Sequence, residues 1–351
     1  MRLTMALSVL AATFMAASPS GTARAEDAIA VGAVFGAADA TGAVRSPFIM
    51  RWSNGTWQRA SLATSLAGNL LGLTRTPTGA LWAYGISAKG ALVVESDDRG
   101  VTWRDVSDRL PADEGGVLEL EFVGSNGIAL TISTSGAARH VLVSADEGKT
   151  WTLREERAGT AVRVGTFGGA VVLVGDDGTG ALVAADGARR EPIEVDAGTS
   201  MTAIGTSPGA FWLAASRSAA GGRDAVLYRK AEHSGADARL VVRDAEFYAT
   251  AFDDAHRGLV GGFRSVGGAV TPFVAYTNDD GQRWNTARIP VSPATGIVRA
   301  VAIGGTQAWA LSNNLGAAGC SVLRSGDGGA TWSVVPSPAD RDGRIRALLV
   351  L

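Results

Sequence analysis

The chain has 351 residues and a formal net charge of −2, and 19% of its residues are charged while 46% are hydrophobic. The near-neutral charge argues against a general nucleic-acid binder, which needs a basic face, and the apolar content is too high for a disordered chain. Glycine is very frequent, at 46 residues. An all-β fold with many tight turns is therefore predicted, because glycine adopts turn conformations that other residues resist.

Residues 1–25 have the pattern of a secretory signal peptide. Arg2 precedes an apolar run from Met5 to Ala17, and the small residues Ala23 and Ala25 precede a cleavage position before Glu26. A retained membrane anchor is the alternative, but the run is short for spanning a bilayer. We expect residues 26–351 to be the mature chain, periplasmic or secreted from a bacterium, with no membrane span.

The few cysteines and histidines limit the disulfides and metal sites that the chain can form. Cys320 is the only cysteine, so no intrachain disulfide can form and the core must supply the stability. The three histidines, His140, His233 and His256, lack metal-ligand spacing. We expect them on surface loops or turns, and we expect no metal and no cofactor.

An internal repeat organises the rest of the chain. Three segments share the pattern Ser-x-Asp-x-Gly-x-Thr-Trp, a fourth starts with Thr and has Arg before its Trp, and a fifth is shortened. In that order they are Ser96–Trp103, Ser144–Trp151, Ser325–Trp332, Thr277–Trp284 and Ser53–Trp57. The tryptophans that end consecutive motifs lie 46 or 48 residues apart, except for a gap of 133 residues that leaves room for two eroded copies, near Glu191 and Leu240. Seven units of this length predict a seven-bladed β-propeller.

Each unit divides into four short antiparallel strands. In the last full unit these are Ile297–Ile303, Gln307–Leu311, Ser321–Arg324 and Thr331–Val335. Further inner strands are expected at Leu70–Thr74, Val117–Val123, Ala161–Phe167, Met201–Ile204 and Phe247–Phe252. The mature chain opens with a second-strand pattern at Ala28–Phe35 and ends with an inner-strand pattern at Arg344–Leu351. The C-terminal strand therefore completes the first blade and closes the ring, which removes open sheet edges.

The repeated segments resemble the Asp-box, or BNR repeat, of sialidases, sortilin-type receptors and propeller-type photosystem II assembly factors. In those families the box lies on the outer hairpin of each blade, away from the ligand-binding face. The resemblance therefore implies a structural role for these residues, and it does not choose among the families that share the repeat.

A binding surface is expected where the inner strands begin. Aligning these strands on their last large apolar residue places polar residues at one level of otherwise apolar strands. In blade order these are Arg346, Asn69, Glu119, Arg163, Ser200, Tyr248 and Arg299. Converging guanidinium groups bind a carboxylate or phosphate through paired hydrogen bonds. Polar residues at strand ends and the abundance of arginine offer the plainer explanation of this ring.

Two hypotheses of function remain open. The first is a non-enzymatic, monomeric binding or assembly module for an unidentified protein or glycan, with Arg163, Arg299, Arg346, Glu119 and Tyr248 as candidate ligand-binding residues. The second is a sialidase-like glycoside hydrolase, since such enzymes hold a carboxylate with three arginines and use a Tyr–Glu pair as nucleophile. The sequence departs from those enzymes in its number of blades and in the late position of Arg288-Ile289-Pro290.

Overall fold

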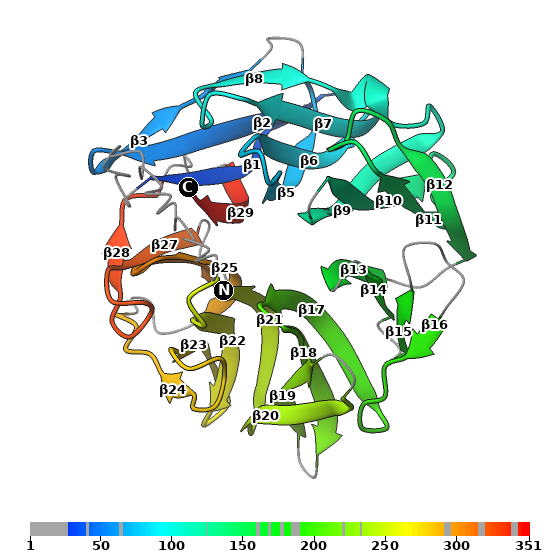
Figure 1. The fold of residues 1–351 in the computed structure, drawn as a ribbon. Coiled ribbons are helices and arrows are strands. Elements are labelled where there is room, and N and C mark those ends of the chain that lie inside the picture. Colours follow the sequence, from blue (N-terminus) through cyan, green and yellow to red (C-terminus); the bar gives the residue numbers. More distant parts are fainter. Residues whose placement is uncertain are drawn as a thin grey trace, which may run out of the picture.

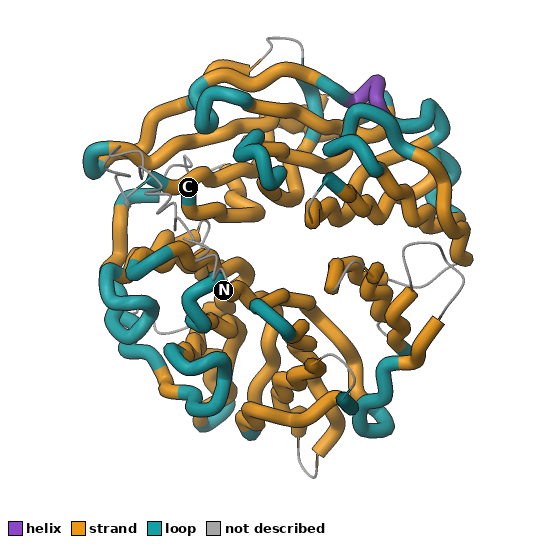
Figure 2. The backbone as a smooth tube through the Cα atoms, viewed as in Figure 1, coloured by secondary structure: helices purple, strands orange, loops and turns teal. Residues whose placement is uncertain are grey.

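Seven blades surround a central opening (Figure 1). The computed structural model describes residues 27–39, 42–62, 66–123, 125–158, 162–167, 170–175, 179–183, 190–219, 222–231, 234–290, 296–314, 320–337 and 343–351. Nearly all of the described chain is strand or turn (Figure 2). The predicted seven-bladed propeller of four-stranded antiparallel blades is thereby confirmed.

The first three blades contain most of the repeated motifs. Blade 1 comprises β29 (Gly343–Val350), β1 (Ala28–Asp39), β2 (Gly42–Ser53) and β3 (Thr56–Arg59). Blade 2 comprises β5 (Asn69–Arg75), β6 (Leu81–Ser87), β7 (Gly90–Ser96) and β8 (Thr102–Asp105), with β4 (Ser61–Leu62) added parallel to β8. The 3-10 turn η1 (Ser107–Arg109) leads to blade 3, which comprises β9 (Glu114–Val123), β10 (Asn126–Ser133), β11 (Ala138–Ser144) and β12 (Thr152–Ala158).

Blades 4 to 7 repeat the same strand order, from the inner to the outer strand. Blade 4 comprises β13 (Val162–Phe167), β14 (Ala170–Gly175), β15 (Gly180–Val183) and β16 (Arg190–Pro192). Blade 5 comprises β17 (Thr199–Ser207), β18 (Ala210–Ala219), β19 (Gly222–Ala231) and β20 (Ala236–Val242). Blade 6 comprises β21 (Ala245–Phe252), β22 (Gly258–Val266), β23 (Ala269–Thr277) and β24 (Asn285–Thr286). Blade 7 comprises β25 (Gly296–Gly304), β26 (Gln307–Asn314), β27 (Cys320–Ser325) and β28 (Ser333–Val335).

The C-terminal strand closes the ring as predicted. β29 pairs antiparallel with β1, from Ala28 opposite Val350 to Val34 opposite Gly343. Ile345 and Leu348 of β29 are buried among residues of blades 1 and 7. The two ends of the chain therefore complete one sheet, and β1 has no open edge.

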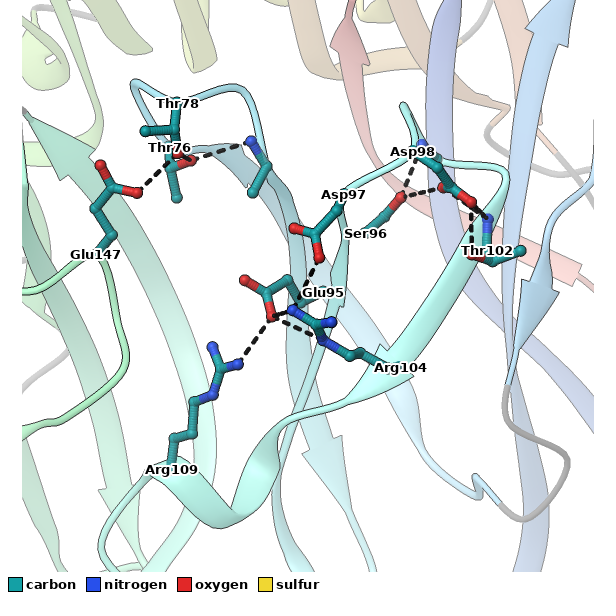
Figure 3. A network of polar contacts seen from close by, with 12 residues as sticks. Thr76, Thr78, Glu95, Ser96, Asp97, Asp98, Thr102, Arg104, Arg109 and Glu147 are labelled. Atoms are coloured by element: carbon teal, nitrogen blue, oxygen red, sulfur yellow. Dashed lines mark hydrogen bonds and ion pairs between the residues drawn. The ribbon is translucent and has the colours of Figure 1, made fainter.

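The shortened motif forms the turn between β2 and β3 of blade 1. The four full-length motifs form the turns between the third and fourth strands of blades 2, 3, 6 and 7. In the turn before β8, the Ser96 hydroxyl and the backbone N–H and hydroxyl of Thr102 all donate to the Asp98 carboxylate (Figure 3). The Gly100 N–H donates to Ser96 Oγ, and the indole N–H of Trp103 donates to the Gly100 carbonyl. Burial would raise the pKa of Asp98, but these hydrogen bonds to its ionised form lower the pKa to about 2.

The glycine of each of these turns packs against the preceding blade. A Cβ on Gly281 would lie 2.1 Å from Cη2 of Trp212 in blade 5, and a Cβ on Gly148 would lie 2.5 Å from Cη2 of Trp82 in blade 2. The motif tryptophans enter the same interfaces, and Trp284 lies edge-on to Trp212 at 5.9 Å between ring centroids. The motif therefore joins neighbouring blades as well as shaping its own turn.

The structure also tests the predictions for the two eroded units and for the histidines. The two eroded units are present as blades 4 and 5, with outer strands at β16 and β20. The expectation that His140 lies on a surface loop is wrong, because it is buried in β11 with Nδ1 2.8 Å from Oε1 of the buried Glu114. His256 lies exposed in a turn as expected, whereas His233 and residues 1–25 lie outside the described residues.

Candidate polar site on the top face

The propeller has two chemically different faces. We call the side where the inner strands begin the top face, and it also carries the turns between second and third strands, such as β22 to β23. The motif turns lie on the opposite, bottom face with the turns between first and second strands. Backbone hydrogen bonds join these two sets, for example from Glu147 N to Ser125 O and from Asp280 N to His256 O. The motifs are thus remote from the top face.

Most inner strands carry a one-residue bulge near their top-face end. The bulged residues, which have no partner opposite them on the second strand, are Arg346, Leu71, Leu118, Thr202, Tyr248 and Arg299. In β9 a second register shift also leaves Gly115 without a partner. In blade 4, β13 pairs with β14 without a register shift. A bulge re-aims a side chain and bends its strand, so these positions form a structurally defined ring.

Glycines opposite three of the bulges allow the strands to approach closely. A Cβ on Gly32, Gly85 or Gly262 would lie 1.9 to 2.0 Å from a carbonyl oxygen of the neighbouring inner strand. Gly262 pairs with Phe247, directly before the bulged Tyr248. Any larger residue there would have to push the inner strand away from the second strand.

Two bulged residues from adjacent blades meet at the top face. The Arg299 guanidinium carbon lies 4.1 Å from the centroid of the Tyr248 ring, and Phe263 stacks on that ring at 6.1 Å. The Tyr248 hydroxyl donates a hydrogen bond to Oε2 of Glu246. Arg223 Nε lies 3.4 Å from Oε1 of the same carboxylate. We call these five residues, Arg223, Glu246, Tyr248, Phe263 and Arg299, the blade 6–7 cluster.

The blade 6–7 cluster carries a protonated phenol and an excess of positive charge. Burial, the hydrogen bond to Glu246 and the charge of Glu246 raise the pKa of Tyr248 to about 12, although Arg299 and Arg223 oppose the shift. The phenol therefore stays protonated at neutral pH. The cluster contains two guanidinium groups and one carboxylate, which leaves an excess of positive charge suited to an anionic ligand.

A second polar pair crosses from blade 3 to blade 4. Glu119 accepts hydrogen bonds from Nη1 of Arg163 at 2.7 Å and from the backbone N–H of Val164 at 2.6 Å. Burial raises the pKa of Glu119, against the lowering effect of the Arg163 charge and of the Val164 N–H. Both acceptor oxygens of Glu119 are engaged within the protein, so this pair ties two blades together.

The remaining ring residues lie on blades 1, 2 and 5. Arg346 is an exposed bulged residue of β29, on blade 1. Asn69 begins β5 and is buried, two residues before the bulge, and Ser200 precedes the bulged Thr202 by two residues. The structure thus pairs Tyr248 with Arg299 and Glu119 with Arg163.

The sequence analysis missed two charged members of the cluster. Glu246 lies two residues before Tyr248 in β21, and this spacing could have suggested it, because residues i and i+2 of a strand share a face. Arg223 comes from the start of β19 in the neighbouring blade. Only the packing of blade 5 on blade 6 brings it to Glu246.

Metal and membrane features are absent from the part of the chain that the structure describes. No group of three His, Cys, Asp or Glu side chains there is arranged to hold a metal ion. Among the same residues, no helix is long and apolar enough to cross a membrane.

Together these features define a closed seven-bladed β-propeller with a charged top face. No protein-family model matches the chain, and no curated protein matches it. Among solved structures, it resembles YCF48 bound to a D1 peptide, with 18% identity and a TM-score of 0.55 over 80% of this chain and 84% of that one.

Two other solved structures span different uses of the fold. The β-propeller domain of the Trilobed protease from Pyrococcus furiosus, which has an open velcro topology, matches with 8% identity and a TM-score of 0.57 over 89% of this chain and 93% of that one. The GH74 xyloglucanase from Xanthomonas campestris matches with 16% identity and a TM-score of 0.53. That match covers 88% of this chain and 52% of the enzyme. At these identities the likeness concerns the fold alone.

Proposed function

We propose that this protein is an exported, non-enzymatic propeller that binds a protein partner through its top face. The observation that carries the proposal is the blade 6–7 cluster, in which Arg223 and Arg299 outnumber the single carboxylate of Glu246 at a partly exposed surface. A carboxylate of the partner would accept hydrogen bonds from these two guanidinium groups. The similarity to YCF48 bound to a D1 peptide supports a peptide-like partner for this fold.

The rest of the proposal concerns the form in which the protein acts. Residues 1–25 would direct export and be removed, and residues 26–351 would act as one monomeric propeller in the periplasm or outside the cell. The repeated turns would be Asp-boxes, with the structural role that the Asp-box families imply. Their packing against the preceding blade supports this assignment.

Affinity enrichment tests the proposal. The mature protein, the Arg223→Ser/Arg299→Ser double variant and the Arg75→Ser control would each be immobilised and exposed to the envelope fraction of the native bacterium. Arg75 is an exposed residue at the bottom-face end of β5. We expect a defined set of proteins retained by the wild type and by Arg75→Ser, and lost from the double variant. Equal retention by all three proteins would contradict top-face binding.

A sialidase-like hydrolase is the second candidate, and one observation favours it. The Tyr248 hydroxyl is hydrogen-bonded to a glutamate beside two arginines, as in a Tyr–Glu nucleophile pair. The high pKa of Tyr248, about 12, opposes this function because a nucleophile must lose its proton. Turnover of a fluorogenic sialoside, abolished by Tyr248→Phe and Glu246→Gln but retained by Glu119→Ala, would establish the hydrolase. No turnover by the wild type would exclude it for that substrate.

A further inference from the structure

Blade 6 has an incomplete outer edge. β23 pairs with β22 along all nine of its residues, but β24 pairs with β23 only at Ala275 and Tyr276. Beyond β24 the chain leaves its own blade, because Arg288 forms a parallel bridge with Thr331 of blade 7. The top-face part of β23 therefore has no neighbour on its outer side among the described residues.

The backbone groups on this edge can be assigned from the pairing. The carbonyl of Val274 accepts a hydrogen bond from the Ala287 N–H, so Val274 directs its backbone groups outward. Alternate residues of an antiparallel strand direct these groups to the same side, so Pro272 and Val270 also face the open edge. Proline is typical of edge strands because it removes a donor. Among the described residues, the Val270 N–H and the carbonyls of Val270 and Pro272 have no backbone partner, so they can pair with an added strand.

An apolar groove lies beside this edge. It has a volume of about 430 Å³ and runs between blades 5 and 6. Leu240 and Val242 of β20 line one side, and Phe273 of β23 and Trp284 line the other. Trp284 also differs from the motif tryptophans of blades 2, 3 and 7, because its buried indole N–H has no acceptor among the described residues, whereas those of Trp103, Trp151 and Trp332 donate to a backbone carbonyl.

The charged residues that line the groove are all positive. Arg243 and Arg264 are its charged lining residues, and no acidic residue lines it. Both arginines are exposed, and neither side chain takes part in an ion pair or hydrogen bond within the described residues. Unpaired guanidinium groups beside an apolar groove favour a partner that carries carboxylates.

From these observations we infer that the edge of β23 is a docking site for an extended, acidic segment of a partner protein. The segment adds a strand beside β23 above β24, and its alternate side chains enter the groove against Leu240, Val242 and Phe273. Its carboxylates pair with Arg243 and Arg264. This surface borders the blade 6–7 cluster, since Pro272 pairs with Phe263, but its groove is lined by other side chains. The inference therefore goes beyond the proposed function and does not depend on Arg223 or Arg299.

Fluorescence anisotropy with a capped, labelled Glu-Val-Asp-Val-Glu-Ile peptide tests the site. Two further peptides serve as controls, one with lysine at every acidic position and one N-methylated on alternate amides, which cannot complete a strand ladder. We expect the acidic peptide to bind at least about tenfold more tightly than either control. The charge reversal Arg243→Glu/Arg264→Glu should invert the preference, so that the lysine peptide binds more tightly than the acidic one.

Hydrogen exchange locates the bound peptide. We expect the Val270 amide to exchange more slowly when the acidic peptide is present, in the wild type and equally in Arg223→Ser/Arg299→Ser. If the top-face variant instead abolishes peptide binding, the peptide occupies the blade 6–7 cluster and the inference is wrong. Equal affinity for all three peptides would also overturn it. So would a concentration-dependent dimer that protects Val270 without peptide, since a second copy would then be the occupant.

Discussion

The guanidinium of Arg299 lies over the ring of Tyr248, 4.1 Å from its centroid, across the boundary between blades 6 and 7. Both residues are the bulged residues of their inner strands. The bulges thus do more than bend the strands, because they place a cation and a phenol from different blades in one cluster. We expect this contact to matter more for ligand binding than for stability.

Replacing Arg299 by leucine tests whether this contact contributes more to ligand binding than to stability. The loss of an exposed cation–π contact should lower the free energy of unfolding by only about 0.5–1 kcal/mol, measured by urea denaturation. Binding of the partners retained by the wild-type top face should fall by at least about tenfold, since a fully charged hydrogen-bond donor is removed. Arg75→Leu is the matched control and should change neither quantity. A stability loss of several kcal/mol with unchanged binding would assign Arg299 a purely structural role.

Gly281 should be much less tolerant of alanine than Gly209. Their φ angles are +73° and +74°, so both substitutions carry the cost of a left-handed backbone. At Gly281 the added Cβ also meets Trp212 at 2.1 Å, whereas nothing lies within 4 Å of a Cβ on Gly209. We expect a loss of about 2–4 kcal/mol for Gly281→Ala and about 1 kcal/mol for Gly209→Ala. Equal losses in thermal or urea unfolding would show that the motif glycine does not join blades 5 and 6.

Acid should weaken the motif turns. Hydrogen bonds from the hydroxyl and N–H of Thr150 and from the Ser144 hydroxyl lower the pKa of Asp146 to about 2, from 3.8 in a free chain. A carboxyl whose pKa is lower in the folded state stabilises the fold above pH 3.8 and loses that contribution as the pH falls toward 2. In Asp146→Asn we expect a lower stability at neutral pH and a shallower decline between pH 4 and 2. Asp108→Asn, on η1, is the control and should keep the wild-type slope.

Removing residues 344–351 should greatly reduce thermal stability. The deletion takes Ile345, Leu348 and Val350 from the core between blades 1 and 7 and exposes the edge of β1. Burial of these three side chains contributes about 5 kcal/mol or more. Arg346→Ser, which keeps the strand, should melt near the wild type. A peptide of residues 343–351 should partly restore the melting temperature of the truncated protein, and an unchanged melting curve would contradict ring closure.

The blade pattern was readable from the sequence because it depends on local, repeated chemistry. The Ser, Asp, Gly and Trp of each motif shape one turn and one interface, so their spacing revealed the number of units and the strand order. The closing role of β29 followed from matching its apolar pattern to that of β25. Even the eroded units near Glu191 and Leu240 were placed by the length of the gap between Trp151 and Trp284.

The polar ring was less readable because a bulge adds a residue without a local signature. Counting back from the last apolar residue reached the bulge in β21, β25 and β29, giving Tyr248, Arg299 and Arg346. It missed the bulge in β9 by one residue, at Glu119 instead of Leu118, and in β17 by two, at Ser200 instead of Thr202. Contacts between blades, such as Arg223 with Glu246, depend on packing that no single strand encodes.

The most direct test of the top-face proposal is site-specific photo-crosslinking in the organism that produces the protein. A photoreactive phenylalanine analogue would replace Phe263 in the blade 6–7 cluster and, as the control, the exposed Val101 of a bottom-face turn. The account predicts a discrete cross-linked partner from position 263, absent from position 101 and lost when Arg223 and Arg299 are both changed to serine. Cross-links from position 101 alone, or from position 263 regardless of the two arginines, would contradict it.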